Sequence, residues 1–370
     1  MRANVLNDTA LVRQARQFAW LSIDSDKPSN AGFVEKFPTE GVPVFLVIDS
    51  ATEKVALSWY GSATASQLVT LLEDGKRVAP GGGSGAEALL ARADELNGQK
   101  KLAEAAEFYE QALKAGGPAW PRRARTVESL VMAYDFGHNQ KACAETAARE
   151  APSLARDRSF VNTVYFGLDC AQPGAPELSK IEQLAEEGVK LPGVLGDDTS
   201  GLYMILASTY RRDKGEDAAT RTATSWLHYL QGQIAKASSA ETRMGYDFQL
   251  VSAALFLHQP ELALADVERA ERDLPRDYNP PLLLATLYRE MERYDDALRA
   301  CDRAMARAYG QANLRVYLAR GRVLAKKGDA VGARKAYAEG LDFGRTLAEA
   351  PAKSYLDALQ KSLDSIGKTQ

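Results

Sequence analysis

The three cysteines are the residues of this chain best suited to redox or metal chemistry, and their spacing argues against both. Cys143, Cys170 and Cys301 lie far apart, in a region that the sequence predicts to be helical. None belongs to a Cys-x-x-Cys motif, the spacing that brings two thiols together in a redox pair or a cysteine zinc site. We therefore predict no metal site, no cofactor and no catalytic thiol.

The histidines and the overall charge argue against further classes of function. His138, His228 and His258 each fall in or at the end of a predicted helix, where a structural role is the usual one. No His-Glu-x-x-His motif, phosphate-binding glycine loop or nucleophile elbow occurs. A net charge of −3 argues against general nucleic-acid binding, which needs a basic face. The sequence thus predicts no catalytic residue and no nucleic-acid partner.

Residues 1–78 are expected to form a mixed α/β segment. Four apolar residues give Met1–Arg16 the spacing of a helix, and the apolar runs that follow predict strands and helices. The predicted elements are a strand over Phe18–Asp24, a short helix over Phe33–Phe37, strands over Gly41–Asp49 and Val55–Gly61, and an amphipathic helix over Thr64–Gly75. The order is therefore helix, strand, helix, strand, strand, helix.

This order resembles the thioredoxin family from the second half of its first long helix onward. The residues that carry the resemblance are Gly41-Val42-Pro43, the aspartate that ends the first predicted strand, and Gly61. The resemblance implies a cis bond between Val42 and Pro43, in the loop that faces the redox disulfide in that family. The alternative is a generic α/β segment whose proline only begins a strand.

The cysteines of that family would lie just before Met1, and the first strand before them. Because disulfide exchange needs an attacking thiolate and a resolving partner, we predict that the chain as given is not an oxidoreductase. Two explanations stay open: the native protein begins upstream, which we favour, or the domain is degenerate. The incomplete sheet would leave an unpaired edge, so we expect it to dimerise or to pack against the rest of the chain.

Residues 86–350 are expected to form an all-α repeat array, after a glycine-rich linker over 79–85. A small–large–small pattern recurs there at a spacing near 34 residues. It occurs at Ala263-Val267-Ala270, Ala297-Cys301-Ala304 and Ala333-Tyr337-Gly340. The pattern lets two antiparallel helices approach closely and resembles the tetratricopeptide repeat.

The resemblance covers residues 86–118 and 244–345, with looser helical pairs between them. Those pairs are 122–136 with 139–150, 156–171 with 175–190, and 199–213 with 216–236. Residues 351–370 are expected to form a capping helix, over 351–366, and a tail. The predicted fold class is thus a partial α/β thioredoxin-like domain followed by an all-α tetratricopeptide solenoid.

The resemblance to tetratricopeptides implies that the first helix of each repeat lines a peptide-binding groove. The candidate groove residues are Phe248, Phe256, Leu282, Arg289, Arg315, Arg322 and Lys326, which make one end apolar and the other basic. An extended peptide with an apolar anchor and an acidic flank would suit such a groove. The alternative is that the basic side chains only form a solvated face.

We therefore predict a non-catalytic protein-interaction scaffold that binds a peptide or a partner protein. The alternative is a thiol–disulfide oxidoreductase whose Cys-x-x-Cys motif lies upstream of Met1, with the repeats recruiting substrate. No run of about 18 apolar residues predicts a membrane span. As written, the chain is expected in the cytoplasm; a signal peptide upstream would make it an exported, periplasmic protein of bacterial type.

Overall fold

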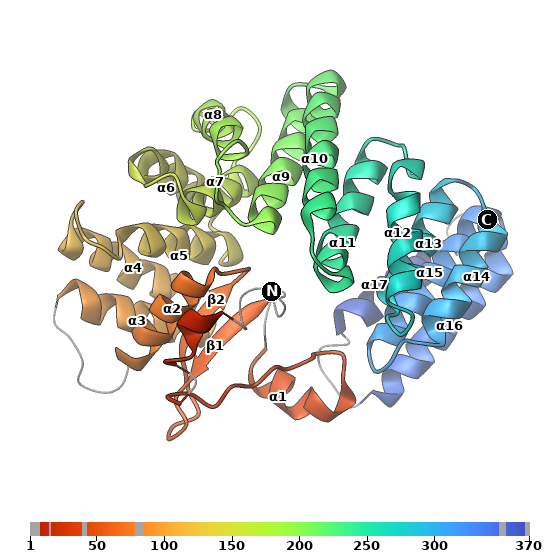
Figure 1. Ribbon diagram of the computed structural model, residues 1–370, viewed down its shortest axis with the longest axis horizontal. Coiled ribbons are helices and arrows are strands. Elements are labelled where there is room, and N and C mark those ends of the chain that lie inside the picture. Colours follow the sequence, from red (N-terminus) through yellow and green to blue (C-terminus); the bar gives the residue numbers. More distant parts are fainter. Residues whose placement is uncertain (1–7, 15, 39–42, 78–84, 348–352, 367–370) are drawn as a thin grey trace. The chain divides into compact units, whose positions relative to one another are not determined.

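The computed structural model describes residues 8–14, 16–38, 43–77, 85–347 and 353–366 (Figure 1). Most of these residues are helical, and the described part of the chain holds one two-stranded sheet. Contacts divide the chain into two compact units. Unit 1 comprises Met1–Ala19 and Gly41–Tyr229, and unit 2 comprises Trp20–Glu40 and Leu230–Gln370.

Unit 1 is built mainly from consecutive helical pairs, which confirms the repeat array predicted there. Its helices are α3 (Ala86–Gly98), α4 (Leu102–Gly116), α5 (Arg123–Phe136), α6 (Gln140–Glu150), α7 (Arg158–Cys170), α8 (Leu178–Gly188), α9 (Gly196–Asp213) and most of α10 (Glu216–Lys236). Ala93 and Ala105 are fully buried where α3 packs on α4. Tyr109 fills the remaining space, and its hydroxyl donates to Asp94 at 2.8 Å.

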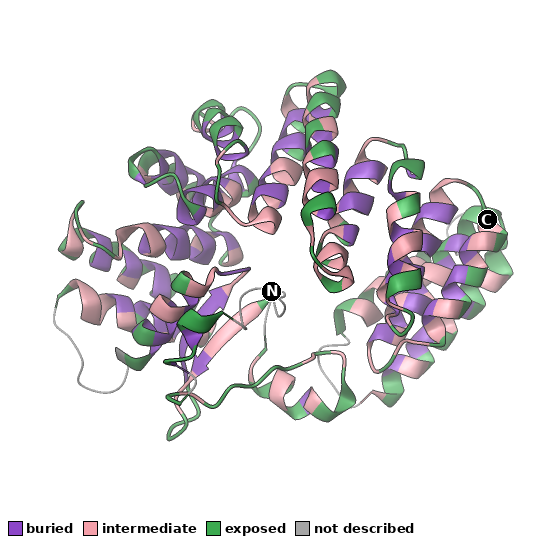
Figure 2. Ribbon diagram, viewed as in Figure 1, coloured by how far each residue is buried: buried purple, intermediate pink, exposed green. Residues whose placement is uncertain are grey.

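A β-hairpin and one helix precede this array in unit 1. β1 (Val44–Ile48) pairs antiparallel with β2 (Val55–Tyr60), with Val44 opposite Tyr60 and Val47 opposite Leu57. Helix α2 (Ala65–Arg77) packs its apolar face on the hairpin, where Leu57, Trp59, Leu68 and Leu71 form a buried cluster (Figure 2). These three elements confirm the two later strands and the amphipathic helix predicted from the sequence.

Two other elements predicted for this segment differ in the described residues. Of the helix predicted over Met1–Arg16, residues 1–7 and 15 lie outside the described residues, and residues 8–14 contain a short 3-10 helix (Thr9–Leu11). Phe18–Asp24 has no regular secondary structure, because its apolar side chains are not buried in a sheet: Leu21 is 71% exposed. The described sheet therefore has two strands, and the predicted thioredoxin-like fold is not confirmed.

Unit 2 continues the series of helical pairs and ends in a capping helix. Its helices are α11 (Ala240–Phe256), α12 (Glu261–Asp273), α13 (Asn279–Glu290), α14 (Tyr294–Met305), α15 (Ala312–Lys327), α16 (Ala330–Thr346) and α17 (Lys353–Ile366). Helix α17 packs on α15 and α16, and its Leu359 is fully buried. Helix α17 thus covers apolar surface of the last helical pair.

The division into units does not follow the linker predicted at 79–85. Residues 78–84 lie outside the described residues, but the hairpin on one side of them belongs to the same unit as α3 on the other. The reason is direct packing: a Cβ on Gly98, the last residue of α3, would lie 2.7 Å from a methyl group of Val55 in β2. The segment 20–40, by contrast, belongs to unit 2, with a short helix α1 (Ala31–Lys36).

Candidate functional site

Within each unit, first helices of successive pairs lie side by side, and we call the surface that they form the first-helix wall of that unit. In unit 1, α7 contacts both α5 and α9. In unit 2, α13 contacts both α11 and α15. The sequence predicts a groove on this surface. The two units differ in how much of the surface other parts of the chain cover.

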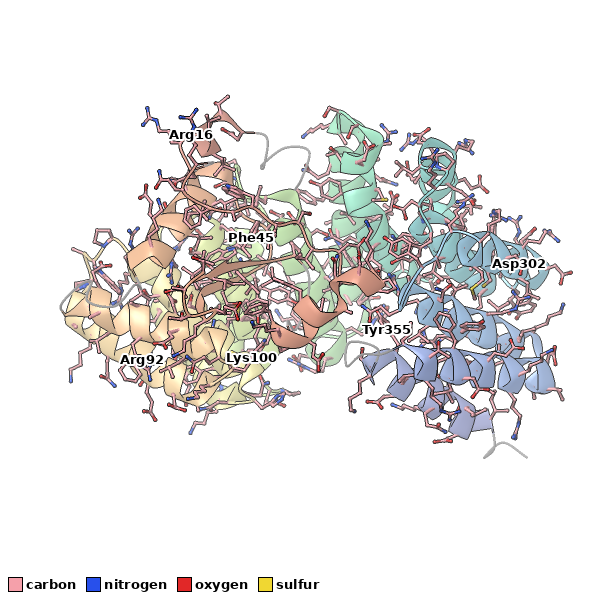
Figure 3. The ribbon with its side chains drawn as sticks, turned by 90° about the horizontal axis from the view of Figure 1, so that it is seen from below. Arg16, Phe45, Arg92, Lys100, Asp302 and Tyr355 are labelled. Atoms are coloured by element: carbon pink, nitrogen blue, oxygen red, sulfur yellow. A yellow bond between two sulfur atoms is a disulfide. The ribbon has the colours of Figure 1, made fainter. Side chains whose placement is uncertain are left out.

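In unit 1 the chain covers its own first-helix wall with β2. Strand β2 contacts α3, and the ring of Tyr60 meets that of Phe136 in α5 edge to face, with 5.4 Å between ring centres. Lys100, labelled in Figure 3, donates to the Tyr60 hydroxyl at 2.6 Å. Ser62, just after the strand, donates to the carboxylate of Asp197 in α9. The hairpin and the residue just after it thus contact α3, α5 and α9.

Arg158 of α7 is the central contact between β2 and the wall. Only 4% of its side chain is exposed. Its guanidinium donates to Glu128 in α5 (2.7 Å) and Asp198 in α9 (3.0 Å), and to the backbone carbonyl of Tyr60 (3.3 Å). It also lies 4.5 Å from the ring centre of Trp59, close enough for a cation–π contact.

One arginine faces two buried carboxylates in this cluster, so their negative charge is incompletely balanced. Burial raises the pKa of Asp198 to about 7, against the opposing effect of Arg158, and the nearby Asp197 and Glu128 raise it further. Oε2 of Glu128 is buried without a hydrogen-bond partner among the described residues, while Oε1 accepts from Asn162 at 2.8 Å. A proton on Asp198 relieves this excess charge.

We expect Asp198→Asn to flatten the pH dependence of stability. The pKa of Asp198 in the folded chain, about 7, lies above its ordinary value of 3.8. Its stabilising contribution is therefore fully present below about pH 4 and is lost as the pH rises through 7. Between pH 5 and 8, urea unfolding should show a smaller loss for the variant, by at most about 1.4 kcal/mol per pH unit. Asp302→Asn, at an exposed carboxylate, is the control; equal losses in all three proteins would contradict the prediction.

Cys143 in α6 and Cys170 in α7 form a disulfide, with 6.0 Å between their Cα atoms. The sequence analysis missed this bond, because 27 residues separate the two cysteines and only the return of the chain through α7 brings them together. Both are buried, and Oδ1 of Asp135 lies 3.4 Å from Sγ of Cys170. Cys301 is free and buried, and burial raises the pKa of its thiol to about 12.

Asp135, Cys143 and Cys170 also have the donor types of a metal site, since one donor atom from each lies within 4.8 Å of the others. Burial raises the pKa of Asp135, which favours its neutral form. The disulfide uses both sulfurs, so the cluster as it stands crosslinks two helices.

In unit 2 the predicted groove residues at the apolar end differ in access. Phe248 of α11 is 64% exposed, and Phe256 of the same helix is half-buried. Leu282 of α13 is buried and supports the wall from beneath. The exposed ring of Phe248 leaves apolar surface in contact with water. A partner that covers this surface would gain binding free energy.

At the predicted basic end, two of the four cations share one carboxylate, that of Glu290. Glu290 accepts from Arg289 at 2.7 Å and from Lys326 at 2.8 Å, and these bonds outweigh burial and lower its pKa. Arg315 donates to Tyr278 and Asn279. Arg322 is exposed and forms no ion pair within the described part of the chain. Of the four predicted cations, Arg322 thus offers its charge most directly to a partner.

The remaining predicted site residues belong to the thioredoxin-like loop. Val42 lies outside the described residues. Pro43 is exposed, immediately before β1, and its carbonyl accepts the N–H of Gly61 at 2.9 Å. The structure therefore shows Pro43 ending the hairpin ladder.

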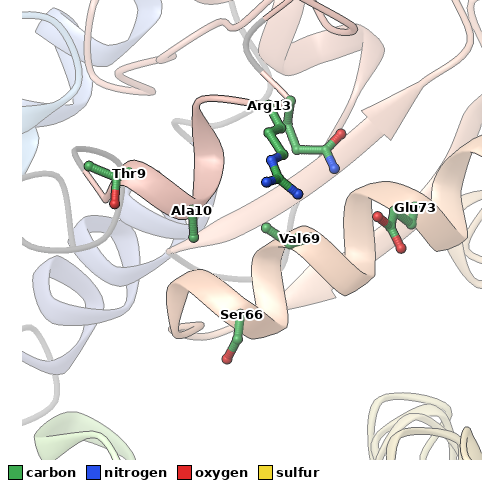
Figure 4. Close-up of a pocket in the computed structure, with 7 residues that line it drawn as sticks. Thr9, Ala10, Arg13, Ser66, Val69 and Glu73 are labelled. Atoms are coloured by element: carbon green, nitrogen blue, oxygen red, sulfur yellow. The ribbon is translucent and has the colours of Figure 1, made fainter.

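A shallow pocket lies between the 3-10 helix at Thr9–Leu11 and α2 in unit 1 (Figure 4). Its lining residues are Thr9, Ala10, Arg13, Gln14, Ser66, Val69 and Glu73. The lining holds one cation and one carboxylate on short or flexible side chains. We assign no function to it.

Comparisons with known proteins found similarity only among solved structures. No protein-family model matches the chain, and no curated protein matches it. Solved structures similar to it include a tetratricopeptide repeat protein from Parabacteroides merdae (12% identity, TM-score 0.46, 74% of this chain and 98% of that one) and yeast Tom70 (13%, 0.40, 76% and 64%). A third is Acl4, an assembly chaperone of RpL4 (13%, 0.38, 76% and 98%). No helix among the described residues is both long enough and apolar enough to cross a membrane.

Proposed function

We propose that this chain is a non-catalytic protein-interaction scaffold that binds an extended peptide on the first-helix wall of unit 2. The observation that supports the proposal is the 64% exposure of Phe248 on α11, a first helix of that unit. The corresponding wall of unit 1 is already covered by β2, so unit 2 presents the accessible surface. Phe248 would hold an apolar anchor of the ligand, and Arg322 would attract an acidic residue near it.

A peptide-array screen tests this function. We expect the wild-type chain to select peptides with an aromatic or aliphatic residue near an acidic one. Phe248→Ser and Arg322→Glu should each weaken binding of the best peptide at least about 10-fold, the equivalent of about 1.4 kcal/mol. Val331→Ser and Arg345→Glu, on the second helix α16, are the matched controls for exposed apolar and basic residues.

Two results would refute this assignment. One is an array that shows no sequence preference, which would leave a purely structural role. The other is binding that falls equally in the α16 variants, which would mean that ligands attach to the surface at large.

We further propose that the β-hairpin is a docking element of unit 1. Its β1–β2–α2 order supports the finer interpretation, a remnant of a thioredoxin-like domain, but its contacts with the first-helix wall make it part of the repeat array. Reduction of insulin by this chain would contradict a non-catalytic role.

A further inference from the structure

The segment Trp20–Pro38, which we call the strap, packs within unit 2 through an acidic turn. Asp24 shapes the turn: its Oδ1 accepts the N–H of Asp26 at 3.0 Å, and its carbonyl accepts the side-chain amide of Asn30 at 2.9 Å. Oδ2 of Asp24 and both carboxylate oxygens of Asp26 accept from other side chains. The turn thus presents two acidic side chains, separated by Ser25, to the helices of unit 2.

Side chains at the N-terminal ends of α13 and α15 receive both carboxylates. The Tyr309 hydroxyl donates to Oδ2 of Asp24 at 2.8 Å, and the Tyr278 hydroxyl donates to Oδ2 of Asp26 at 2.8 Å. Gln311 donates through one nitrogen to Oδ1 of Asp26 (3.0 Å) and to the carbonyl of Ser25 (3.2 Å). Each carboxylate therefore has its own donor, and the backbone between them is also bound.

Arg315 adds positive charge behind these donors. Its guanidinium donates to the Tyr278 hydroxyl at 3.0 Å and lies 5.6 Å from the centre of that ring. A hydroxyl that accepts from a cation donates more strongly to a carboxylate, so Arg315 favours an acidic occupant without touching it. The tyrosine rings meet edge to face, 6.0 Å apart, which fixes the spacing of the two hydroxyls.

Gly310 shows that the site fits a closely approaching backbone. It has a φ of +50°, and a Cβ there would lie 1.9 Å from the carbonyl oxygen of Asp26 and 3.1 Å from Cδ of Pro28. No side chain fits in that space. The contact therefore depends on a glycine between Tyr309 and Gln311, as well as on the polar donors.

The acidic turn of the strap is held by these polar contacts, and the apolar residues just before it are largely exposed. Trp20, Leu21 and Ile23 precede the turn, and 43%, 71% and 37% of their surfaces are exposed. When the strap is released, water replaces each hydrogen bond to a partly exposed carboxylate, so the net loss is small. A buried apolar anchor has no such replacement. A segment bound in this way can be displaced by another with the same two acidic side chains.

We propose that Tyr278, Tyr309, Gly310, Gln311 and Arg315 form a binding site for Asp-x-Asp peptide segments, which the strap occupies and thereby closes. An acidic segment from a partner competes with the strap for this site. Because the strap is tethered, its effective concentration is of order millimolar, so weak ligands are excluded until the strap is released. The site is separate from Phe248 and Arg322, so failure of peptide binding there leaves this proposal untouched.

The test uses the full chain and a labelled synthetic peptide of residues 20–37. Asp24→Asn/Asp26→Asn is the strap-released variant, and amide hydrogen exchange over residues 20–37 should be faster in it than in the wild type. Fluorescence anisotropy should show the peptide binding this variant at least 10-fold more tightly than the wild type. The same peptide with both aspartates replaced by asparagine should bind neither protein.

Two further variants locate the binding. Adding Tyr278→Phe/Tyr309→Phe, or Gly310→Ala, to the strap-released chain should abolish peptide binding; circular dichroism checks that the helices persist. Unchanged hydrogen exchange in the strap-released variant would overturn the proposal, as would peptide binding that survives these substitutions. A strap-released variant that exchanges faster but binds no peptide would overturn it equally.

Discussion

Arg158→Met is expected to lower the free energy of unfolding by about 3–5 kcal/mol, because it leaves the Glu128 carboxylate, and that of Asp198 above its pKa of about 7, without their cation. Glu128 is buried, Asp198 is partly buried, and both are bonded to this guanidinium. The methionine keeps much of the side-chain volume, so the loss reports charge more than packing. Urea unfolding followed by circular dichroism gives the measurement. A loss below about 1 kcal/mol, typical of an exposed ion pair, would contradict this account.

Two controls separate charge from packing in that experiment. Arg211→Met removes an exposed pair with Glu216 and should cost less than about 1 kcal/mol. The triple variant Arg158→Met/Glu128→Gln/Asp198→Asn removes the stranded charges as well. It should recover a large part of the lost stability, since neutral side chains cost far less to bury than unpaired carboxylates. A triple variant no better than Arg158→Met would place the effect in the lost contacts with Trp59 and Tyr60.

Reducing the disulfide, or replacing both cysteines in Cys143→Ala/Cys170→Ala, is expected to cost about 3–4 kcal/mol. The bond closes a loop of 27 residues, and the chain-entropy relation gives this magnitude for a loop of that length. The reductant should shift the urea midpoint of the wild type and leave that of the double variant unchanged. Three alkylatable thiols in the denatured, unreduced protein would show that the bond does not form.

The helical pairs could be predicted from the sequence because their signals are local. Apolar spacing within each helix shows which face is buried, and small residues such as Ala93 and Ala105 mark where two helices approach. The predicted pair over 122–136 and 139–150 accordingly coincides with α5 and α6. The capping helix has a local signal too, since a terminal helix with one apolar face indicates that it packs on the apolar surface of the last pair.

The contacts that define the surfaces could not be predicted, since each joins residues distant in sequence. Phe18–Asp24 has the composition of a strand, yet a strand also needs a partner edge, and composition does not show whether one exists. The cation of Arg158 is matched by acids 30 and 40 residues away, on other helices. Lys326 has the spacing of a free cation in a groove, but its partner Glu290 lies 36 residues away and meets it only in the folded chain.

The strap and the segment after the hairpin are synthesised long before some of the residues that they contact. Ser62 bonds to a residue 135 positions later in the sequence, and Asp24 bonds to Tyr309, 285 positions later. At about 5–20 residues per second, the ribosome needs roughly 15–60 s to supply that second partner. The first segments to be made are thus among the last to be placed. Until then the polar groups of the acidic turn have no partners in unit 2, and the segment is open to chaperones and to neighbouring nascent chains.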